Sequence, residues 1–120
     1  DQDRAAALQW LRKAAALGNA KAINFVGSFH EDGWVVERDM AAAAEHYARA
    51  AEGGDFRGQF NHARMLIDAG EIESAIGWIR RLPETATPAF LAKAAAWLRT
   101  TALPPLHAEA DYLHRRGDKT

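Results

Sequence analysis

Two clusters of polar and cationic side chains recur at the same helical spacing, and such clusters can bind an anionic group. The first cluster consists of Lys21, Asn24 and Ser28, which stand three and four residues apart and therefore share one face of a helix. The second cluster repeats this spacing 36 residues later with Arg57, Phe60 and Arg64. Cations beside an amide and an aromatic ring can hold a carboxylate of a peptide. The competing interpretation is that these are ordinary solvated positions on amphipathic helices.

The sequence carries none of the usual arrangements for nucleophilic or metal-dependent catalysis. Its two serines, Ser28 and Ser74, lie outside Gly-x-Ser-x-Gly and Ser-x-x-Lys motifs. His30 and Glu31 begin like the zinc motif His-Glu-x-x-His, but Trp34 stands where the second histidine is required. A metal site needs three or four convergent ligands, and the five histidines form no such set. We therefore predict no catalytic residue, no metal site and no cofactor.

Composition excludes several classes of function. The chain has 120 residues and no cysteine, so disulfides and thiolate metal sites are excluded. The formal net charge is −1 with both signs mixed, whereas nucleic-acid binders usually carry a basic excess. No apolar run approaches the roughly 20 residues that span a membrane, and no leader sequence is visible. We expect a soluble protein with no nucleic-acid partner and no membrane insertion, in either the cytoplasm or the periplasm.

An internal repeat dominates the organisation of the chain. Residues 3–7 recur at 39–43, and residues 13–15 recur as 49–51 with the pattern Lys/Arg-Ala-Ala. The pair Gly18-Asn19 recurs as Gly54-Asp55, so every match has the same offset of 36 residues. A fixed period of this size is typical of stacked helical arrays, which work by presenting a surface to a partner.

Capping and turn residues divide the chain into about seven helices. Asn19, Asp39 and Asp55 are predicted N-caps, and Thr87 followed by proline is a further start signal. Glycines at the ends of the runs suit left-handed C-terminal turns. The predicted helices are 4–17, 20–31, 39–52, 55–69, 71–82, 88–101 and 106–116, the last as a C-terminal cap.

Residue size predicts how these helices pack. Three small residues stand in mid-helix, where a neighbouring helix can approach closely: Gly27, Ala63 and Ala95. Three bulky residues are predicted to fill the space between layers: Trp10, Tyr47 and Trp78. His30 and His62 are expected to be packed or half-buried rather than ligands.

The residues from Gly18 to Gly54 resemble the Sel1-like repeat, a relative of the tetratricopeptide repeat. The resemblance rests on Val26-Gly27, Gly33-Trp34-Val35, Asp39 and the run from His46 through Tyr47 to Ala51. Residues 10–19 and 59–61 are similar to other parts of the same pattern. Val35 replaces a glycine of the pattern, and His62 replaces a leucine. The third unit, formed by the predicted helices 55–69 and 71–82, lacks the long loop. The resemblance implies an all-α, right-handed α/α solenoid of about three helix pairs, forming a single domain over residues 1–120.

In the tetratricopeptide class the first helix of each pair lines the concave face. The resemblance therefore implies that helices 20–31, 55–69 and 88–101 form that face. The candidate partner-binding residues are then the two clusters above together with Arg99: Lys21, Asn24, Ser28, Arg57, Phe60, Arg64 and Arg99. The implied function is a non-catalytic scaffold or adaptor that binds another protein or a peptide, with a carboxylate or an acidic segment as the favoured ligand.

The sequence leaves open two alternatives from other classes of function. One is a hydrolase acting on cell-wall or β-lactam substrates, an activity claimed for cysteine-rich chains of similar pattern. The other is a purely structural segment of a longer repeat array. Turnover of a reporter β-lactam that is lost on Ser28→Ala would support the hydrolase, and additional 36-residue units before residue 1 would support the array.

Overall fold

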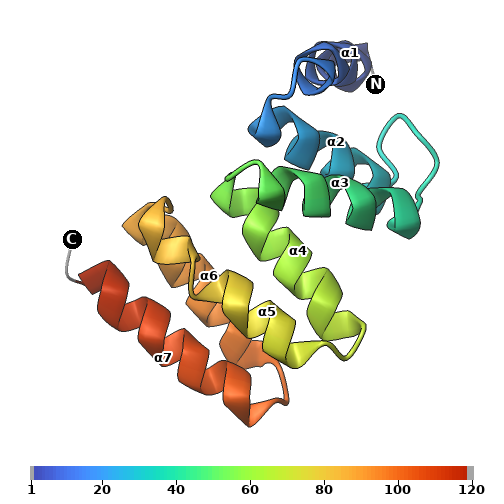
Figure 1. Ribbon diagram of the computed structural model, residues 1–120. Coiled ribbons are helices and arrows are strands. Elements are labelled where there is room, and N and C mark those ends of the chain that lie inside the picture. Colours follow the sequence, from blue (N-terminus) through green and yellow to red (C-terminus); the bar gives the residue numbers. More distant parts are fainter. Residues whose placement is uncertain (1, 119–120) are drawn as a thin grey trace.

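The computed structural model describes residues 2–118, and within them the chain is built from helices with no strand. Figure 1 shows the helices following one another from α1 at one end to α7 at the other. The elements are α1 (Gln2–Ala16), α2 (Ala20–Asp32), α3 (Met40–Glu52), α4 (Phe56–Asp68), α5 (Ile72–Ile79), a short 3-10 helix η1 (Leu82–Glu84), α6 (Pro88–Thr100) and α7 (Pro104–Asp118).

The predicted N-caps are confirmed. At the start of each of four helices a side-chain oxygen accepts a hydrogen bond from a backbone N–H at 2.9–3.1 Å, and these caps are Asn19, Asp39, Asp55 and Thr87. Each cap satisfies a donor that the first helical turn would otherwise leave free. Gly18 adopts a positive φ of 88°, which allows the sharp turn between α1 and α2.

The C-terminal half differs from the expectation in two places. The α7 helix begins at Pro104 instead of Leu106 and continues through Gly117 to Asp118. Prolines are tolerated there because the N–H groups of the first helical turn have no acceptor within the helix. The α5 helix ends at Ile79, and Pro83 lies in the separate turn η1.

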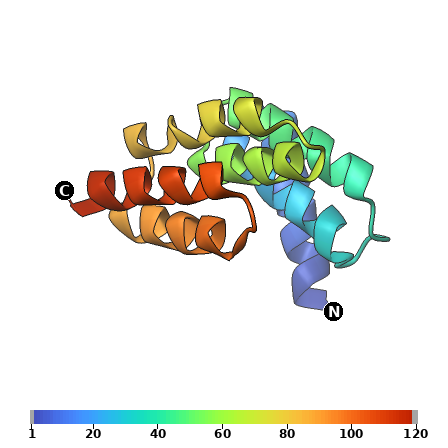
Figure 2. The same ribbon diagram turned by 90° about the horizontal axis from the view of Figure 1, so that it is seen from below.

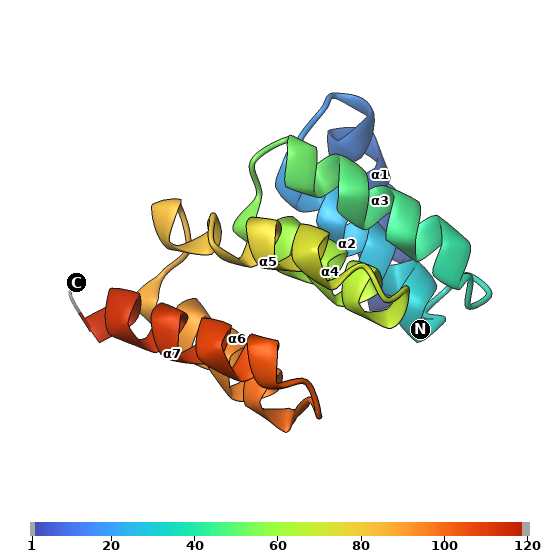
Figure 3. The same ribbon diagram turned by 60° about the horizontal axis from the view of Figure 1, so that its bottom comes forward.

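The helices pack as antiparallel pairs in two layers, which is the α/α solenoid expected from the repeat. The pairs are α2 with α3, α4 with α5, and α6 with α7, while α1 packs on α2 and α3 packs on α4. Figure 2 shows α3 and α5 above α2 and α4, and α7 above α6. In Figure 3 the α6–α7 pair lies beside the group formed by the earlier helices. None of the described helices combines the length and apolar character needed to cross a membrane.

Two of the three residues predicted to fill the space between layers lie against neighbouring helices, and Trp10 does not. Tyr47 is 1% exposed and Trp78 is half-buried, but the side chain of Trp10 is 72% exposed. The prediction for Trp10 is wrong because α2, the main helix packed against α1, covers its other face through Leu8 and Val26. His30 and His62 are half-buried, as expected.

Candidate functional site

A groove of about 610 Å³ lies between the first helices of the three pairs, α2, α4 and α6. These are the helices that were expected to line the concave face. Its lining residues come from α2 (Asn24, Phe25, Ser28), from α4 (Arg57, Phe60, Asn61) and from α6 with its cap (Thr87, Ala89, Phe90, Lys93, Ala94, Trp97). The groove is therefore a composite of three helix pairs, and no single pair could form it.

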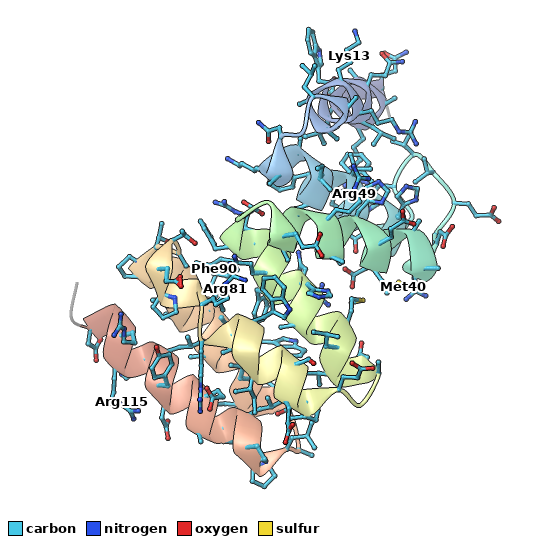
Figure 4. The ribbon with its side chains drawn as sticks, in the orientation of Figure 1. Lys13, Met40, Arg49, Arg81, Phe90 and Arg115 are labelled. Atoms are coloured by element: carbon cyan, nitrogen blue, oxygen red, sulfur yellow. The ribbon has the colours of Figure 1, made fainter. Side chains whose placement is uncertain are left out.

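Aromatic rings build the apolar wall of the groove. The ring of Phe60 on α4 meets the rings of Phe90 and Trp97 on α6 edge-on, with centroids 5.7 and 5.6 Å apart. Phe56 meets Phe90 at 4.9 Å in the same manner. Figure 4 labels Phe90, which projects from the start of α6 toward α4. Edge-to-face contacts stabilise such pairs and leave the outer faces of the rings available for an apolar ligand group.

The charged residues in the lining are all cations. Arg57 and Lys93 reach the groove from α4 and α6, and the lining contains no Asp or Glu. The Arg57 guanidinium lies over the ring of Phe56 at 4.5 Å from its centroid, and this cation–π contact stabilises the position of the charge. A concave surface with charges of one sign attracts groups of the opposite sign.

Arg64, a predicted ligand-binding cation, is committed to an internal network. Its guanidinium donates to both carboxylate oxygens of Glu31 at 2.9 and 3.2 Å, linking α4 to α2. It also donates to Asn61 Oδ1, and the side chains of Arg64 and Glu31 are only 21% and 22% exposed. The hydrogen bonds from Arg64 hold the pKa of Glu31 below its usual range, assisted by the O–H of Tyr47. Arg64 therefore joins two helices and does not line the groove.

Ser28 lies at the edge of the same network. Its hydroxyl is 3.2 Å from Tyr47 Oη and 3.4 Å from the backbone oxygen of Asn24, and Tyr47 donates its own proton to Glu31. Burial raises the pKa of Tyr47 well above its usual value, and the hydrogen bond to Glu31 acts in the same direction. Neither partner of Ser28 is a base that could accept its proton at neutral pH, so the hydrolase alternative gains no support.

The structure brings four of the seven predicted site residues into the groove. Asn24, Ser28, Arg57 and Phe60 line it, whereas Lys21 is exposed outside the lining. Arg99 also lies outside the lining and forms a 3.2 Å ion pair with Asp111 of α7. The carboxylate partner of Arg64 is largely buried, whereas the pair between Arg99 and Asp111 is exposed to solvent.

Most of the contribution of α6 to the groove was not predicted from the sequence. Phe90, Lys93 and Trp97 stand three and four residues apart, which is the same spacing as in the clusters on α2 and α4. That spacing was the signal that could have identified them, but the prediction for helix 88–101 rested on Arg99 alone. Asn61, also missed, is adjacent to Phe60 and belongs to the network of Arg64.

The groove offers binding chemistry rather than a metal centre. Within residues 2–118, no group of three or more His, Asp or Glu side chains is placed to hold a metal ion. The lining supplies hydrogen-bond donors, positive charge and aromatic surface.

The comparisons with known proteins agree with this architecture. A family model described as the Sel1 repeat matches residues 1–19 and 20–55. A crystal structure of a Sel1 repeat protein from Oxalobacter formigenes superimposes with a TM-score of 0.73 and 23% sequence identity. The match covers 99% of this chain and 50% of that chain, so this chain spans half the length of that protein.

The resemblance drawn from the sequence is thereby confirmed for residues 1–55, and the described residues 2–118 have the fold of a Sel1-type α/α solenoid. At 23% identity the structural match is evidence of fold alone. Sel1 repeats are in general helical scaffolds for protein–protein interaction.

Proposed function

We propose that this chain is a protein-interaction module whose groove between α2, α4 and α6 binds a peptide segment with a bulky apolar side chain beside a carboxylate. The proposal rests on the kinds of residue that line the groove. Phe60, Phe90 and Trp97 supply an apolar wall, Arg57 and Lys93 supply positive charge, and no lining residue is acidic.

Magnitudes favour a ligand that uses both features. An exposed ion pair contributes only about 0–1 kcal/mol, so two cations alone bind weakly. Burying one Leu- or Phe-sized side chain contributes about 1.5–3 kcal/mol. A groove of about 610 Å³ has room for such a side chain together with the adjoining backbone. The apolar contact therefore supplies most of the affinity, and the cations select among apolar ligands.

A pair of short peptides tests this proposal. The acidic probe is acetyl-Gly-Phe-Glu-Glu-amide, and the neutral probe carries Gln in place of both Glu residues. We expect the acidic probe to bind more tightly, to lose affinity between 50 and 500 mM salt, and to shift the indole signal of Trp97 in an NMR titration. Equal affinity of the two probes, or binding that does not respond to salt, would remove the charged groove from the proposal.

Matched variants separate the groove from general surface charge. The double variant Arg57→Ala/Lys93→Ala removes both lining cations. The control Arg49→Ala/Arg115→Ala removes the same charge from exposed positions on α3 and α7, outside the groove lining (Figure 4). We expect only the first double variant to weaken the acidic probe, with both variants melting close to the parent protein. A loss of the same size in both variants would mean that net charge, and not the groove, attracts the probe.

A second candidate, from the structural class, is supported by α1. Its residues Ala7, Trp10 and Leu11 stand 36 positions before Ala43, His46 and Tyr47. On α3, Ala43 and Tyr47 are almost completely buried against α2 and His46 is half-buried. On α1, Ala7 is exposed, Leu11 is half-buried and Trp10 is 72% exposed. We infer that this face of α1 packs against a further helix in a longer repeat array, as an additional unit would require. Extending the chain by one repeat helix before Asp3 tests this inference.

A further inference from the structure

We propose that Arg64 and Asn61 orient the side-chain amide of Asn24 so that the groove wall offers an N–H donor, which makes the groove select ligands carrying a hydrogen-bond acceptor. Arg64 and Asn61 are positioning residues in this scheme, and Asn24 makes the contact. The inference rests on the proposed function of the groove and names the polarity of the group that it binds there.

The orientation begins at the ion pair between α2 and α4. Arg64 has only donors, and its Nε and Nη2 atoms lie 3.1 and 2.8 Å from one terminal atom of the Asn61 amide. That atom must be the oxygen, because an NH₂ group at this place would point its own N–H donors at two N–H donors of Arg64. The guanidinium is itself held by both oxygens of Glu31, so it cannot turn away to accommodate the opposite orientation.

The fixed polarity extends one residue further, to Asn24. With its oxygen on Arg64, Asn61 presents its Nδ2 to Asn24, and the two amides meet at 2.8 Å. The Asn24 atom at that contact must then be its oxygen. The remaining Asn24 group, Nδ2, is a donor, and within residues 2–118 no protein acceptor is assigned to it. The relay runs from a carboxylate through a guanidinium and two amides, and each step permits one orientation.

The donor is open to the groove although Asn24 as a whole is only 2% exposed. Among the described residues, the buried side-chain atoms without a partner are His30 Nδ1 and Gln59 Oε1, and Asn24 Nδ2 is not one of them. Since Nδ2 has no protein partner either, solvent in the groove must reach it, and Asn24 is one of the lining residues. A carbonyl or carboxylate oxygen can take the place of that water.

The selected chemistry follows from the N–H donors that these lining residues add to the groove. Asn24 offers an N–H, Arg57 and Lys93 offer charged N–H groups, and no lining carboxylate competes as an acceptor. A ligand with acceptors satisfies all of these groups. A ligand that only donates leaves Asn24 unpaired, and an unpaired buried polar group weakens binding.

Asn61→Asp reverses the relay with almost no change of shape. One oxygen of the introduced carboxylate keeps the hydrogen bonds from Arg64, and the other faces Asn24 where an N–H stood before. Asn24 must then turn its Nδ2 toward that carboxylate and expose its oxygen to the groove. The substitution also adds a negative charge, so uncharged probes are needed to detect the polarity alone.

Two neutral probes isolate the polarity. N,N-dimethyl-2-phenylacetamide only accepts hydrogen bonds, and 2-phenylacetamide both accepts and donates. We expect the parent protein to bind both with similar affinity in NMR titrations that follow Phe60, Phe90 and Trp97. In Asn61→Asp we expect at least a fivefold loss for the dimethyl probe and a change of less than twofold for 2-phenylacetamide. Equal losses for the two probes would overturn the relay, since a merely loosened groove weakens both.

The side-chain amide protons give a readout that needs no variant. In the parent protein we expect both Asn24 amide protons to exchange with water and to shift on addition of the dimethyl probe, while the one Asn61 proton that donates to Asn24 stays protected. A protected Asn24 proton, with both Asn61 protons unprotected, would overturn the relay even if Asn61→Asp failed to fold. If no probe shifts the groove resonances, the proposed function fails, while the order of amide exchange still decides the relay.

Discussion

Gly27 of α2 packs directly against the phenol ring of Tyr47 on α3. A Cβ atom placed on Gly27 would lie 2.9 Å from Tyr47 Cε1 and 3.1 Å from the Cβ of His46. The ring is 1% exposed and its hydroxyl is held by Glu31 and Ser28, so it has no free space into which to move. The close contact between α2 and α3 therefore depends on the absence of a side chain at position 27.

Gly27→Leu is expected to destabilise the protein severely. Overpacking of a close helix contact typically costs about 1–3 kcal/mol, and a rigid, hydrogen-bonded ring places this case at or above about 3 kcal/mol. Thermal and urea unfolding followed by circular dichroism measures the effect. A Gly27→Leu protein as stable as its parent would show that the helices can separate without cost.

Gly77 in α5 provides the matched control, because a Cβ there would meet no atom within 4 Å. Gly77→Leu is expected to stabilise the protein by about 0.5–1 kcal/mol, since leucine, like alanine, loses less backbone entropy in a helix than glycine does. Changes of opposite sign in the unfolding free energy of the two variants would confirm that the contact with Tyr47 decides the effect at position 27.

The second prediction compares two arginines of the same helix. Arg64→Ala removes a bidentate partner from Glu31, whose side chain is only 22% exposed, and is expected to cost about 2 kcal/mol of unfolding free energy. Arg57→Ala removes a cation that lies over Phe56 at the groove and is expected to change stability by no more than about 0.5 kcal/mol. Equal urea midpoints for the two variants would contradict the structural role of Arg64.

The third prediction concerns acid destabilisation by two histidines. Burial lowers the pKa of His62 and of His30 below their ordinary value of 6.5, and at His30 the charge of His46 adds to this effect. Buried Nδ1 of His30 has no hydrogen-bond partner among the described residues. The unfolded chain therefore takes up protons at a higher pH than the folded chain. The contribution of the two histidines to stability is fully present above about pH 6.5 and is lost as the pH falls through their folded pKa values.

Melting temperatures between pH 7.5 and 5 test this dependence. His62→Leu keeps the apolar contact with Trp78 and removes one titrating group, so its melting temperature should fall less over this range. Glu31, with its lowered pKa, contributes stability that is complete above about pH 4.5 and is lost only in more acidic solution. A parent protein whose melting temperature rises on acidification from pH 7.5 to 5 would contradict the expected destabilisation by the histidines.

Local signals predicted the fold well, and long-range pairing explains where they failed. Asn19, Asp39, Asp55 and Thr87 cap helices as expected because a cap interacts with residues only three positions away. The start of α7 was misplaced because two prolines can end a helix or begin one, and only the following packing decides between these outcomes.

The candidate site was predicted in part for the same reason. Helical spacing placed Asn24, Arg57 and Phe60 on the face that lines the groove, since spacing is a property of one helix. The partner of Arg64 stands 33 residues away in sequence, and that of Arg99 lies in another helix. The residue pattern within one helix does not identify a partner on another helix. Both cations were therefore predicted to be free for a ligand.

The fourth prediction concerns the exposed face of α1. Residues 20–38 stand directly before Asp39, and Asp39 matches Asp3 in the 36-residue register. A copy of residues 20–38 placed directly before Asp3 should therefore fold as a helix against α1, as α2 packs against α3. In the extended protein, the copied glycine would face Leu11, which is the counterpart of Tyr47. Trp10 is the counterpart of His46, which contacts Gly27 in the present structure, so Trp10 would lie at the new interface.

Fluorescence and thermal unfolding measure the outcome of this extension. The copy carries Phe in place of its tryptophan, so that any change in emission comes from the original four tryptophans. Trp10, now 72% exposed, should become less accessible to acrylamide, its emission should shift to shorter wavelength, and the melting temperature should rise. In a Trp10→Ala background the emission shift should disappear. An extended protein in which Trp10 remains as accessible as before would show that this face of α1 does not take a repeat helix, and the longer-array candidate would then be abandoned.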